Sequence, residues 1–234
     1  MDNINFPSAL TRPPSKAKVR THGKRAILYV KPTNHSIKKA VSHQTQPENP
    51  IMSTRGPWKI LNEKMLHETP WIRIDHHDVI TPAGTPGIYT TVDFKNWAIG
   101  IIPVDDEGYT YIVGQYRFPL QEYSWEIPEG GGNKGSTLLE SAQRELLEET
   151  GISADNWEMI YEFNTSNSVT NECAFVFLAT GLTFGEAHPE ETEELETKKI
   201  LFSDLLEMVY RNEVKDSLTV IGVLMAAKIL ASAK

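Results

Sequence analysis

The segment from Gly130 to Ile152 constrains the fold of this 234-residue chain more than any other. Three consecutive glycines open it. The sequence that follows, STLLESAQRELLEET, places Leu139, Ala142 and Leu146 at the three- and four-residue spacing of an amphipathic helix. Strand-like segments lie on both sides of this helix. The pattern therefore predicts an α/β fold of the α+β type, in which a mixed sheet accompanies a central helix.

The ends of the helix and the strands around it follow from local patterns. Ser136 is a plausible N-cap, and Gly151 is expected to end the helix in the left-handed conformation. Before the helix, alternating segments predict three antiparallel strands, then a buried strand that turns at DDEG into a hairpin partner, and a short strand running into the glycine loop. Further strands and two closing helices follow. The expected strands cover residues 58–68, 71–81, 87–94, 97–104, 109–118, 123–127, 158–166, 172–182 and 197–202, and the last two helices begin near Ser203 and Asp216.

Three glutamates share one face of the predicted helix. Glu145, Glu148 and Glu149 are spaced by three and four residues, where like charges repel and where the nearby helix C-terminus disfavours negative charge. A solvated helix face is the plain alternative. However, the preceding glycines let a backbone approach a ligand closely, and Arg144 can hold the Glu148 carboxylate. Hard carboxylate oxygens on one rigid face suit Mg²⁺, or Mn²⁺, bound next to phosphate.

Charge divides the chain into two parts. The net charge is −8, but residues 1–50 contain nine Lys and Arg and only two acids, which gives +7 and leaves −15 for the rest. We expect a basic, disordered extension over residues 1–51, with an organellar transit peptide as an alternative, and ordered chain from Met52 onward. The acidic remainder argues against a nucleic-acid partner. No apolar run reaches about 18 residues, so no membrane span is expected.

The stretch GGGNKGSTLLESAQRELLEETGI resembles the Nudix box of the Nudix hydrolases, a glycine, five residues, a glutamate, seven residues and then REUxEExGU, where U is aliphatic. Gly130 matches the first glycine, and the residues from Arg144 to Ile152 match the end of the box at the correct spacing. Ser136 departs from the pattern, because it stands where the box has its first glutamate. The resemblance implies a Nudix-like mixed sheet between helices, with Gly130, Glu145, Glu148 and Glu149 as metal ligands.

The resemblance extends over roughly residues 57–230. VGQYRFPL followed by WEIPEGG is similar to the branch of the family that hydrolyses ADP-ribose and other nucleoside diphosphate sugars. It implies that Arg117 and Glu126 contact the substrate, although an ordinary ion pair at two strand ends is the alternative. The branch also places a catalytic glutamate in the loop before the last strand. Here that loop is acidic, and Glu191, with Glu193 next, is the predicted base.

Taken together, these features predict a Mg²⁺-dependent pyrophosphohydrolase that cleaves a nucleotide sugar such as ADP-ribose or GDP-mannose. The predicted catalytic residues are Glu191, Glu193 and Glu148. The resemblance further implies antiparallel N-terminal strands over residues 52–95, a Nudix domain over 96–234 and a homodimer. The single cysteine cannot form an internal disulfide, which favours a cytoplasmic location. A dinucleoside polyphosphate hydrolase and a non-hydrolysing ADP-ribose sensor are the alternatives. Aromatic residues near the site could stack on a base, but core packing is the expectation for Trp97, Tyr116 and Phe118.

Overall fold

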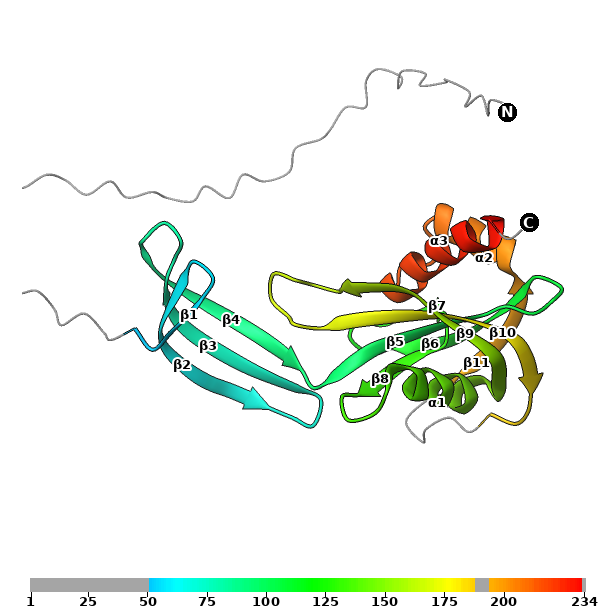
Figure 1. Cartoon of the computed structure of the whole chain (residues 1–234), viewed down its shortest axis with the longest axis horizontal. Helices are drawn as coiled ribbons and strands as arrows, with labels where there is room; N and C mark the ends of the chain where they lie inside the picture. Colours follow the sequence, from blue (N-terminus) through cyan, green and yellow to red (C-terminus); the bar gives the residue numbers. More distant parts are fainter. Residues whose placement is uncertain (1–50, 188–193, 233–234) are drawn as a thin grey trace, which may run out of the picture. The chain divides into compact units, whose positions relative to one another are not determined.

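The computed structural model describes residues 51–187 and 194–232, all of which belong to the structural unit Glu48–Lys234 (Figure 1). The predicted disordered extension, apart from Ile51, lies outside the described residues. The same is true of Glu191 and Glu193, the two candidate loop glutamates. The domain boundaries after residues 51 and 95 therefore stay predictions.

A four-stranded antiparallel sheet forms the N-terminal part of the described chain. Its strands lie in the order β1-β2-β3-β4, and they are β1 (Ser53–Arg55), β2 (Trp58–Glu68), β3 (Ile72–Ile80) and β4 (Pro86–Phe94). Alternate residues of β3, which are Asp75, His77 and Val79, are buried on one face. The three predicted strands are confirmed, and β1 is a short addition that pairs with the start of β2.

The rest of the chain forms two further sheets. A four-stranded mixed sheet has the order β8-β5-β10-β9, in which β5 and β10 are parallel, and a three-stranded antiparallel sheet has the order β11-β6-β7. The strands are β5 (Asn96–Pro103), β6 (Tyr109–Arg117), β7 (Glu122–Glu126), β8 (Glu129–Asn133), β9 (Ile152–Asn164), β10 (Cys173–Phe184) and β11 (Glu196–Leu201). The predicted mixed α/β class is confirmed.

The predicted pairing of β5 with β6 is wrong. The turn at Asp105–Gly108 does form, because the Asp105 side chain accepts hydrogen bonds from the backbone N–H groups of Glu107 and Tyr109. Beyond a single bridge between Val104 and Thr110, however, the two strands separate into different sheets. Both edges of β5 are already paired, one with β8 and the other with β10, so β6 instead pairs with β7 and β11.

The three consecutive glycines form part of strand β8, where a loop was predicted. They pair with β5, and Gly130 lies opposite Ile99. A Cβ atom on Gly130 would collide with the Glu145 carboxylate, and one on Gly132 would come within 2.8 Å of the Ile99 side chain. The glycines therefore let the helix and the neighbouring strand approach β8 more closely than side chains would allow.

The helix of the box, α1 (Leu138–Thr150), begins one residue later than predicted. Its N-cap is Thr137, whose hydroxyl accepts from the Glu140 N–H while the Glu140 carboxylate accepts from the Thr137 N–H, forming a capping box. Ser136 is exposed and caps nothing. At the other end Gly151 adopts the predicted left-handed conformation, with φ of 70°. On the apolar face Leu138 packs into the core, whereas the predicted core residue Leu139 is exposed.

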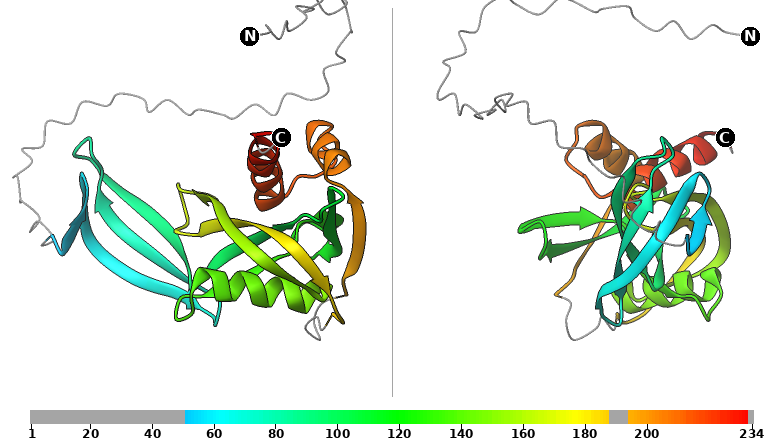
Figure 2. Two further views of the ribbon diagram at one scale, coloured as in Figure 1. Left: turned by 45° about the vertical axis from the view of Figure 1, so that its right-hand side comes forward. Right: turned by 90° about the vertical axis from the view of Figure 1, so that its left-hand side faces the viewer.

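The mixed sheet is covered on both faces, as Figure 2 shows. Alternate residues of its central strands enter two separate hydrophobic clusters, so that Phe175 and Phe177 pack with α1 while Ala174 and Val176 pack on the opposite side. That opposite cluster includes α2 (Phe202–Tyr210) and α3 (Ser217–Ser232). The near-continuous apolar run of β5 is thus explained by burial on both faces.

The predicted buried terminal helix is α3. Gly222 lets it approach the mixed sheet, because a Cβ there would come within 2.9 Å of Val176. Over the described residues, none of the helices combines the length and the apolar character needed to cross a membrane.

Candidate active site

The glutamates of α1 face the glycine strand. Glu145 and Glu149 are buried, and Glu148 is partly exposed. The Glu145 carboxylate lies directly against the backbone of Gly130, and Glu149 Oε2 accepts a hydrogen bond of 3.0 Å from the Glu129 N–H. The structure therefore brings the predicted carboxylates together with the start of β8, at the position that the box assigns to its first glycine.

Arg144 connects this cluster to the strand. Its guanidinium lies 2.6 Å from a carboxylate oxygen of Glu148 and 2.6 Å from one of Glu145, and it donates to the Gly131 carbonyl at 2.9 Å. Burial disfavours the charge, but the attraction of the two carboxylates outweighs it and raises the pKa of Arg144. The predicted contact between Arg144 and Glu148 is confirmed, and the arginine holds Glu145 as well.

The chemistry of this donor set fits a hard divalent cation. Glu145, Glu148 and Glu149 offer carboxylate oxygens on one rigid helix face, and they lie beside a strand whose carbonyl groups are oxygen donors of the same kind. Arg144 adds one positive charge beside these three carboxylates. A divalent cation would add further positive charge to this face, so the residues present are compatible with Mg²⁺ or Mn²⁺.

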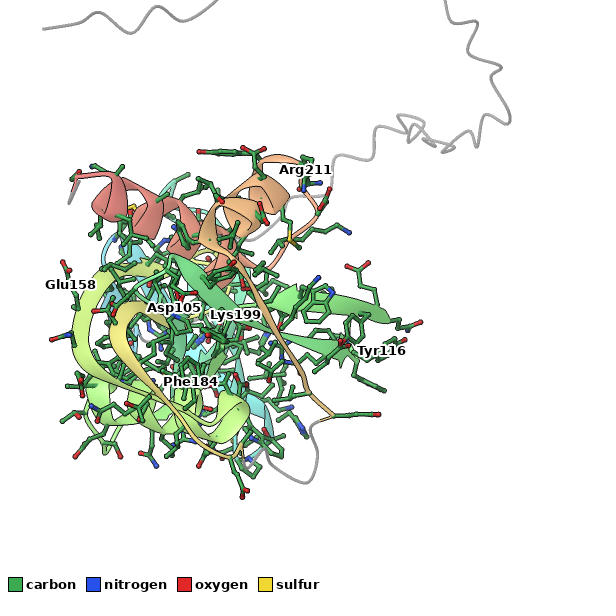
Figure 3. The ribbon with its side chains drawn as sticks, turned by 90° about the vertical axis from the view of Figure 1, so that its right-hand side faces the viewer. Asp105, Tyr116, Glu158, Phe184, Lys199 and Arg211 are labelled. Atoms are coloured by element: carbon green, nitrogen blue, oxygen red, sulfur yellow. The ribbon has the colours of Figure 1, made fainter. Side chains whose placement is uncertain are left out.

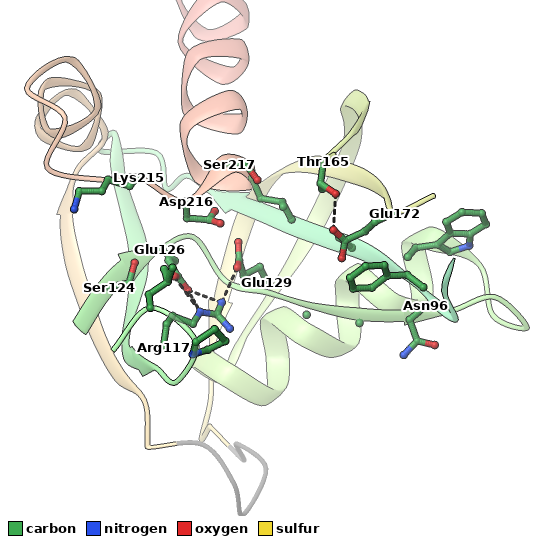
Figure 4. Close-up of a pocket in the computed structure, with 18 of the residues that line it drawn as sticks. Asn96, Arg117, Ser124, Glu126, Glu129, Thr165, Glu172, Lys215, Asp216 and Ser217 are labelled. Atoms are coloured by element: carbon green, nitrogen blue, oxygen red, sulfur yellow. Dashed lines mark hydrogen bonds and ion pairs between the residues drawn. The ribbon is translucent and has the colours of Figure 1, made fainter. Parts of the chain in front are cut away.

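Arg117 and Glu126 are also close together, at the ends of β6 and β7. The guanidinium donates to Glu126 through Nε at 3.0 Å and through Nη2 at 2.6 Å, and Nη2 also lies 2.7 Å from Glu129 Oε1 (Figure 4). Burial disfavours the charge of Arg117, but Glu126 and Glu129 outweigh this effect and raise its pKa. Its Nη1 group makes no hydrogen bond with the described residues, which leaves donors for a ligand.

Sequence reasoning missed two residues of this group, Glu129 and Asp216. One carboxylate oxygen from each of Glu126, Glu129 and Asp216 lies within 4.8 Å of the others. Burial, followed by the negative charges of Asp216 and Glu126, raises the pKa of Glu129 well above its ordinary value. Glu129 stands directly before the first glycine of the box, which could have drawn attention to it. Asp216 is distant in sequence, and no local pattern indicates it.

These residues line a cavity of about 730 Å³. Figure 4 shows Glu129 and Asp216 pointing towards each other beside Arg117. Gly130 and Gly131 also line the cavity, so it reaches the strand against which the box glutamates lie. The other end has an aromatic lining, which consists of Trp71, Phe94 and Trp97. The cavity therefore joins a charged end near the box to an aromatic end, where Asn96 and Glu172 also line it.

The expectation that Trp97, Tyr116 and Phe118 belong to the core holds only for the first. Trp97 packs edge-on against Phe175, with 5.6 Å between the ring centroids. Tyr116 and Phe118 are 60% and 86% exposed. They lie where β6 and β7 extend as a hairpin beyond the body of the domain, as the position of Tyr116 in Figure 3 shows. Among the described residues, no other strand or helix packs over this end of the hairpin.

The segments on either side of the acidic loop both lie near the end of α1. On one side, the Gly185 N–H donates to the Gly151 carbonyl at 2.7 Å. On the other, the Thr197 hydroxyl lies 3.5 Å from the Glu149 carbonyl oxygen. Both flanks are thus held beside the box helix.

Comparison with known proteins agrees with this geometry. The family model of the NUDIX domain matches residues 95–216, and that of the nucleoside diphosphate sugar hydrolase N-terminal domain matches residues 58–92. The chain belongs to the Nudix family. It is a Nudix hydrolase, as the box predicted, with the antiparallel sheet preceding the Nudix domain.

Curated relatives and a solved structure support this assignment. The chain is 38% identical to an ADP-ribose pyrophosphatase of Bacillus subtilis over 52% of this chain and 67% of that protein. It is 30% identical to an ADP-ribose pyrophosphatase of Mycobacterium tuberculosis over 71% of this chain and 82% of that protein. A crystal structure of an ADP compounds hydrolase superposes with a TM-score of 0.68 at 18% identity, covering 74% of this chain and 94% of the other, and so supports the fold.

Proposed function

We propose that this Nudix hydrolase is a Mg²⁺-dependent pyrophosphohydrolase of nucleoside diphosphate sugars, with ADP-ribose as the first candidate. The observation that carries the proposal is the carboxylate face of α1 packed against the glycine strand, at a cavity that also contains Arg117. The two relatives named as ADP-ribose pyrophosphatases favour ADP-ribose among the possible substrates. The products would be a nucleoside monophosphate and a sugar phosphate.

Glu145, Glu148 and Glu149 would hold the cation, with a backbone carbonyl at or next to Gly130. Bound there, Mg²⁺ would neutralise the diphosphate and lower the pKa of a coordinated water. Arg144 positions two of these carboxylates in its absence, since it contacts both Glu145 and Glu148. The cation would add to the positive charge that the guanidinium provides.

Arg117 would bind a phosphate oxygen of the substrate. Its Nε and Nη2 groups are fixed by Glu126 and Glu129, so the guanidinium plane is held in one orientation while Nη1 keeps its donors for a ligand. Glu126 would then act by orienting Arg117. Two alternatives were given for Arg117 and Glu126, a substrate contact and an ion pair at two strand ends. This assignment includes both, because the ion pair positions the substrate-binding group.

A base must remove a proton from the attacking water. The water oxygen would form a bond to one phosphorus as the bridging P–O bond breaks, and the proton would pass to a carboxylate. We propose a glutamate of the acidic loop for this role, Glu191 or else Glu193. The support is that both flanks of the loop are held at the end of α1, next to Glu149.

A substrate panel tests the proposal. With Mg²⁺, the protein should hydrolyse ADP-ribose to AMP and ribose 5-phosphate, and at least one other nucleotide sugar such as GDP-mannose or UDP-glucose more slowly. Diadenosine polyphosphates should be poor substrates. A faster reaction with diadenosine polyphosphates would favour the alternative hydrolase. Tight binding of ADP-ribose without turnover would favour a sensor. The homodimer and the cytoplasmic location stay predictions that the panel does not address.

A further inference from the structure

Four side chains form the pocket floor, a term used here for Arg117, Glu126, Glu129 and Asp216. The three carboxylates lie within 4.8 Å of one another, and Arg117 contacts two of them. Asp216 is fixed by its own helix, because its Oδ2 accepts a hydrogen bond of 2.7 Å from the backbone N–H of Thr219 in the first turn of α3. The floor is therefore a rigid group with a defined charge.

The charge of the pocket floor is negative. Three carboxylates against one guanidinium give a formal charge of −2. Lys215 also lines the cavity, but it is largely exposed and its Nζ lies 3.5 Å from Glu122 at the rim. Because Glu126 is buried and Glu129 and Asp216 are partly buried, salt screens their charge less than it would at the surface. An anionic group placed against the three carboxylates would be repelled, whereas the Nη1 group of Arg117 keeps its donors for the phosphate assigned to it above.

The pocket floor also lacks one hydrogen-bond donor. Glu129 Oε2 is buried and has no hydrogen-bond partner among the described residues, although Oε1 of the same carboxylate contacts Arg117. A buried acceptor without a donor costs free energy. A hydroxyl group can donate to it, whereas the oxygens of an ionised phosphate or carboxylate cannot. The missing partner is thus of the kind that a sugar carries.

The position of the pocket floor decides which part of a substrate meets it. Glu129 is followed directly by Gly130, whose backbone lies against the carboxylate of the box glutamate Glu145. A diphosphate held at the box would place its attached group within reach of the floor. The aromatic end of the cavity suits the base of a nucleotide sugar, which leaves its sugar for the floor. In a longer polyphosphate the attached group is another phosphate.

We propose that Glu129 and Asp216 are specificity-determining residues, which accept hydroxyl groups of the distal sugar and exclude substrates with an anionic group at that place. The inference rests on the proposed function. It identifies the residues that discriminate between substrates with a neutral distal group and substrates with a charged one. Glu129 contributes the orphaned acceptor. Asp216 contributes charge from the position directly before α3.

Two matched substrates test this role, ADP-ribose and ADP-ribose 1″-phosphate, which differ by one phosphate on the distal sugar. With Mg²⁺, the wild-type kcat/KM should favour ADP-ribose by about 100-fold, given the repulsion between like charges a few ångströms apart in a partly buried site. Asp216→Asn and Glu129→Gln should each reduce this preference to about 10-fold. Asparagine still caps α3, and glutamine still offers an oxygen to Arg117, so both variants should fold.

The matched control is Glu158→Gln, which removes one negative charge from an exposed position on β9 outside the cavity. It should leave the ratio of the two kcat/KM values unchanged. Equal use of both substrates by the wild type, or an unchanged ratio in both floor variants, would overturn the specificity role while leaving the proposed function standing. Failure of the wild type to hydrolyse ADP-ribose would reject the proposed function and this inference together.

Discussion

At the scale of single residues, Gly130 and Glu145 explain why the box begins with a glycine. The Glu145 carboxylate occupies the space that a Cβ on residue 130 would need, so the glycine is required by the site and by no turn. The sequence predicted both residues and the contact between Arg144 and Glu148. It could not indicate the charged floor, because Asp216 reaches Glu129 only through the packing of α3 on the sheets.

Gly130→Ala should therefore impair the site. The added methyl group must displace the buried carboxylate of Glu145, which we expect to lower kcat at least 10-fold and stability by about 1–3 kcal/mol. Steady-state kinetics and urea unfolding would measure the two effects. Gly135→Ala is the matched control, since its Cβ would meet only the tip of the Asn133 side chain. Equal effects of the two substitutions would contradict this account.

Glu148→Gln and Glu149→Gln should each lower turnover by about two orders of magnitude or more, because each removes a charged ligand from the proposed metal site. Folding should survive, since glutamine keeps the size and an acceptor oxygen of each side chain. Turnover of ADP-ribose with Mg²⁺ and thermal unfolding are the measurements. Near-wild-type rates in both variants would show that these carboxylates hold no catalytic metal.

At the scale of elements, the local patterns predicted which segments form strands but not every pairing. The turn after β5 reads as a hairpin in the sequence, yet both edges of β5 belong to β8 and β10. Competition between distant strands for the edges of β5 cannot be recognised from the local sequence around the turn. The N-cap of α1 shows the same limit on a smaller scale. Ser136 and Thr137 are both capping residue types, and the reciprocal hydrogen bonds with Glu140 decide for Thr137.

Thr137→Ala should destabilise the protein by about 1 kcal/mol, whereas Ser136→Ala should have little effect.

The backbone and hydroxyl of Thr137 lower the pKa of Glu140 below its ordinary value of 4.5. A lowered pKa stabilises the fold above the unfolded-state pKa, and this contribution is lost as the pH falls through the folded-state pKa. Thr137→Ala keeps the backbone N–H and loses only the part of this effect that the hydroxyl provides, so the wild-type advantage should shrink modestly below about pH 4.5. Urea unfolding at pH 7 and pH 4 would measure it. A larger loss for Ser136→Ala would assign the cap to Ser136.

At the scale of the whole molecule, the hairpin between β9 and β10 ties the N-terminal sheet to the Nudix domain. The side chain of Asn171 accepts from the Phe94 N–H at 2.8 Å and donates to Asp93 at 2.9 Å, and Val92 donates to the Val169 carbonyl. Phe94 and the hairpin residue Thr165 both line the cavity. The sequence predicted N-terminal antiparallel strands and a mixed sheet in the Nudix domain. It did not predict this connection, which depends on contacts between segments distant in the chain.

The basic segment before this sheet should be dispensable. Met52 is anchored at the start of the described chain, since its N–H donates to the Ile60 carbonyl at 2.8 Å. Residues 1–50 contribute +7 to a chain of net charge −8, a composition unlike that of the folded part. A protein that starts at Met52 should keep kcat/KM for ADP-ribose within about two-fold and its unfolding temperature within about 2 °C, because it retains every described residue of the cavity and the core. Purification of both forms, followed by kinetics and thermal unfolding, would measure this. Loss of solubility or activity on truncation would mean that the segment belongs to the fold or to the site.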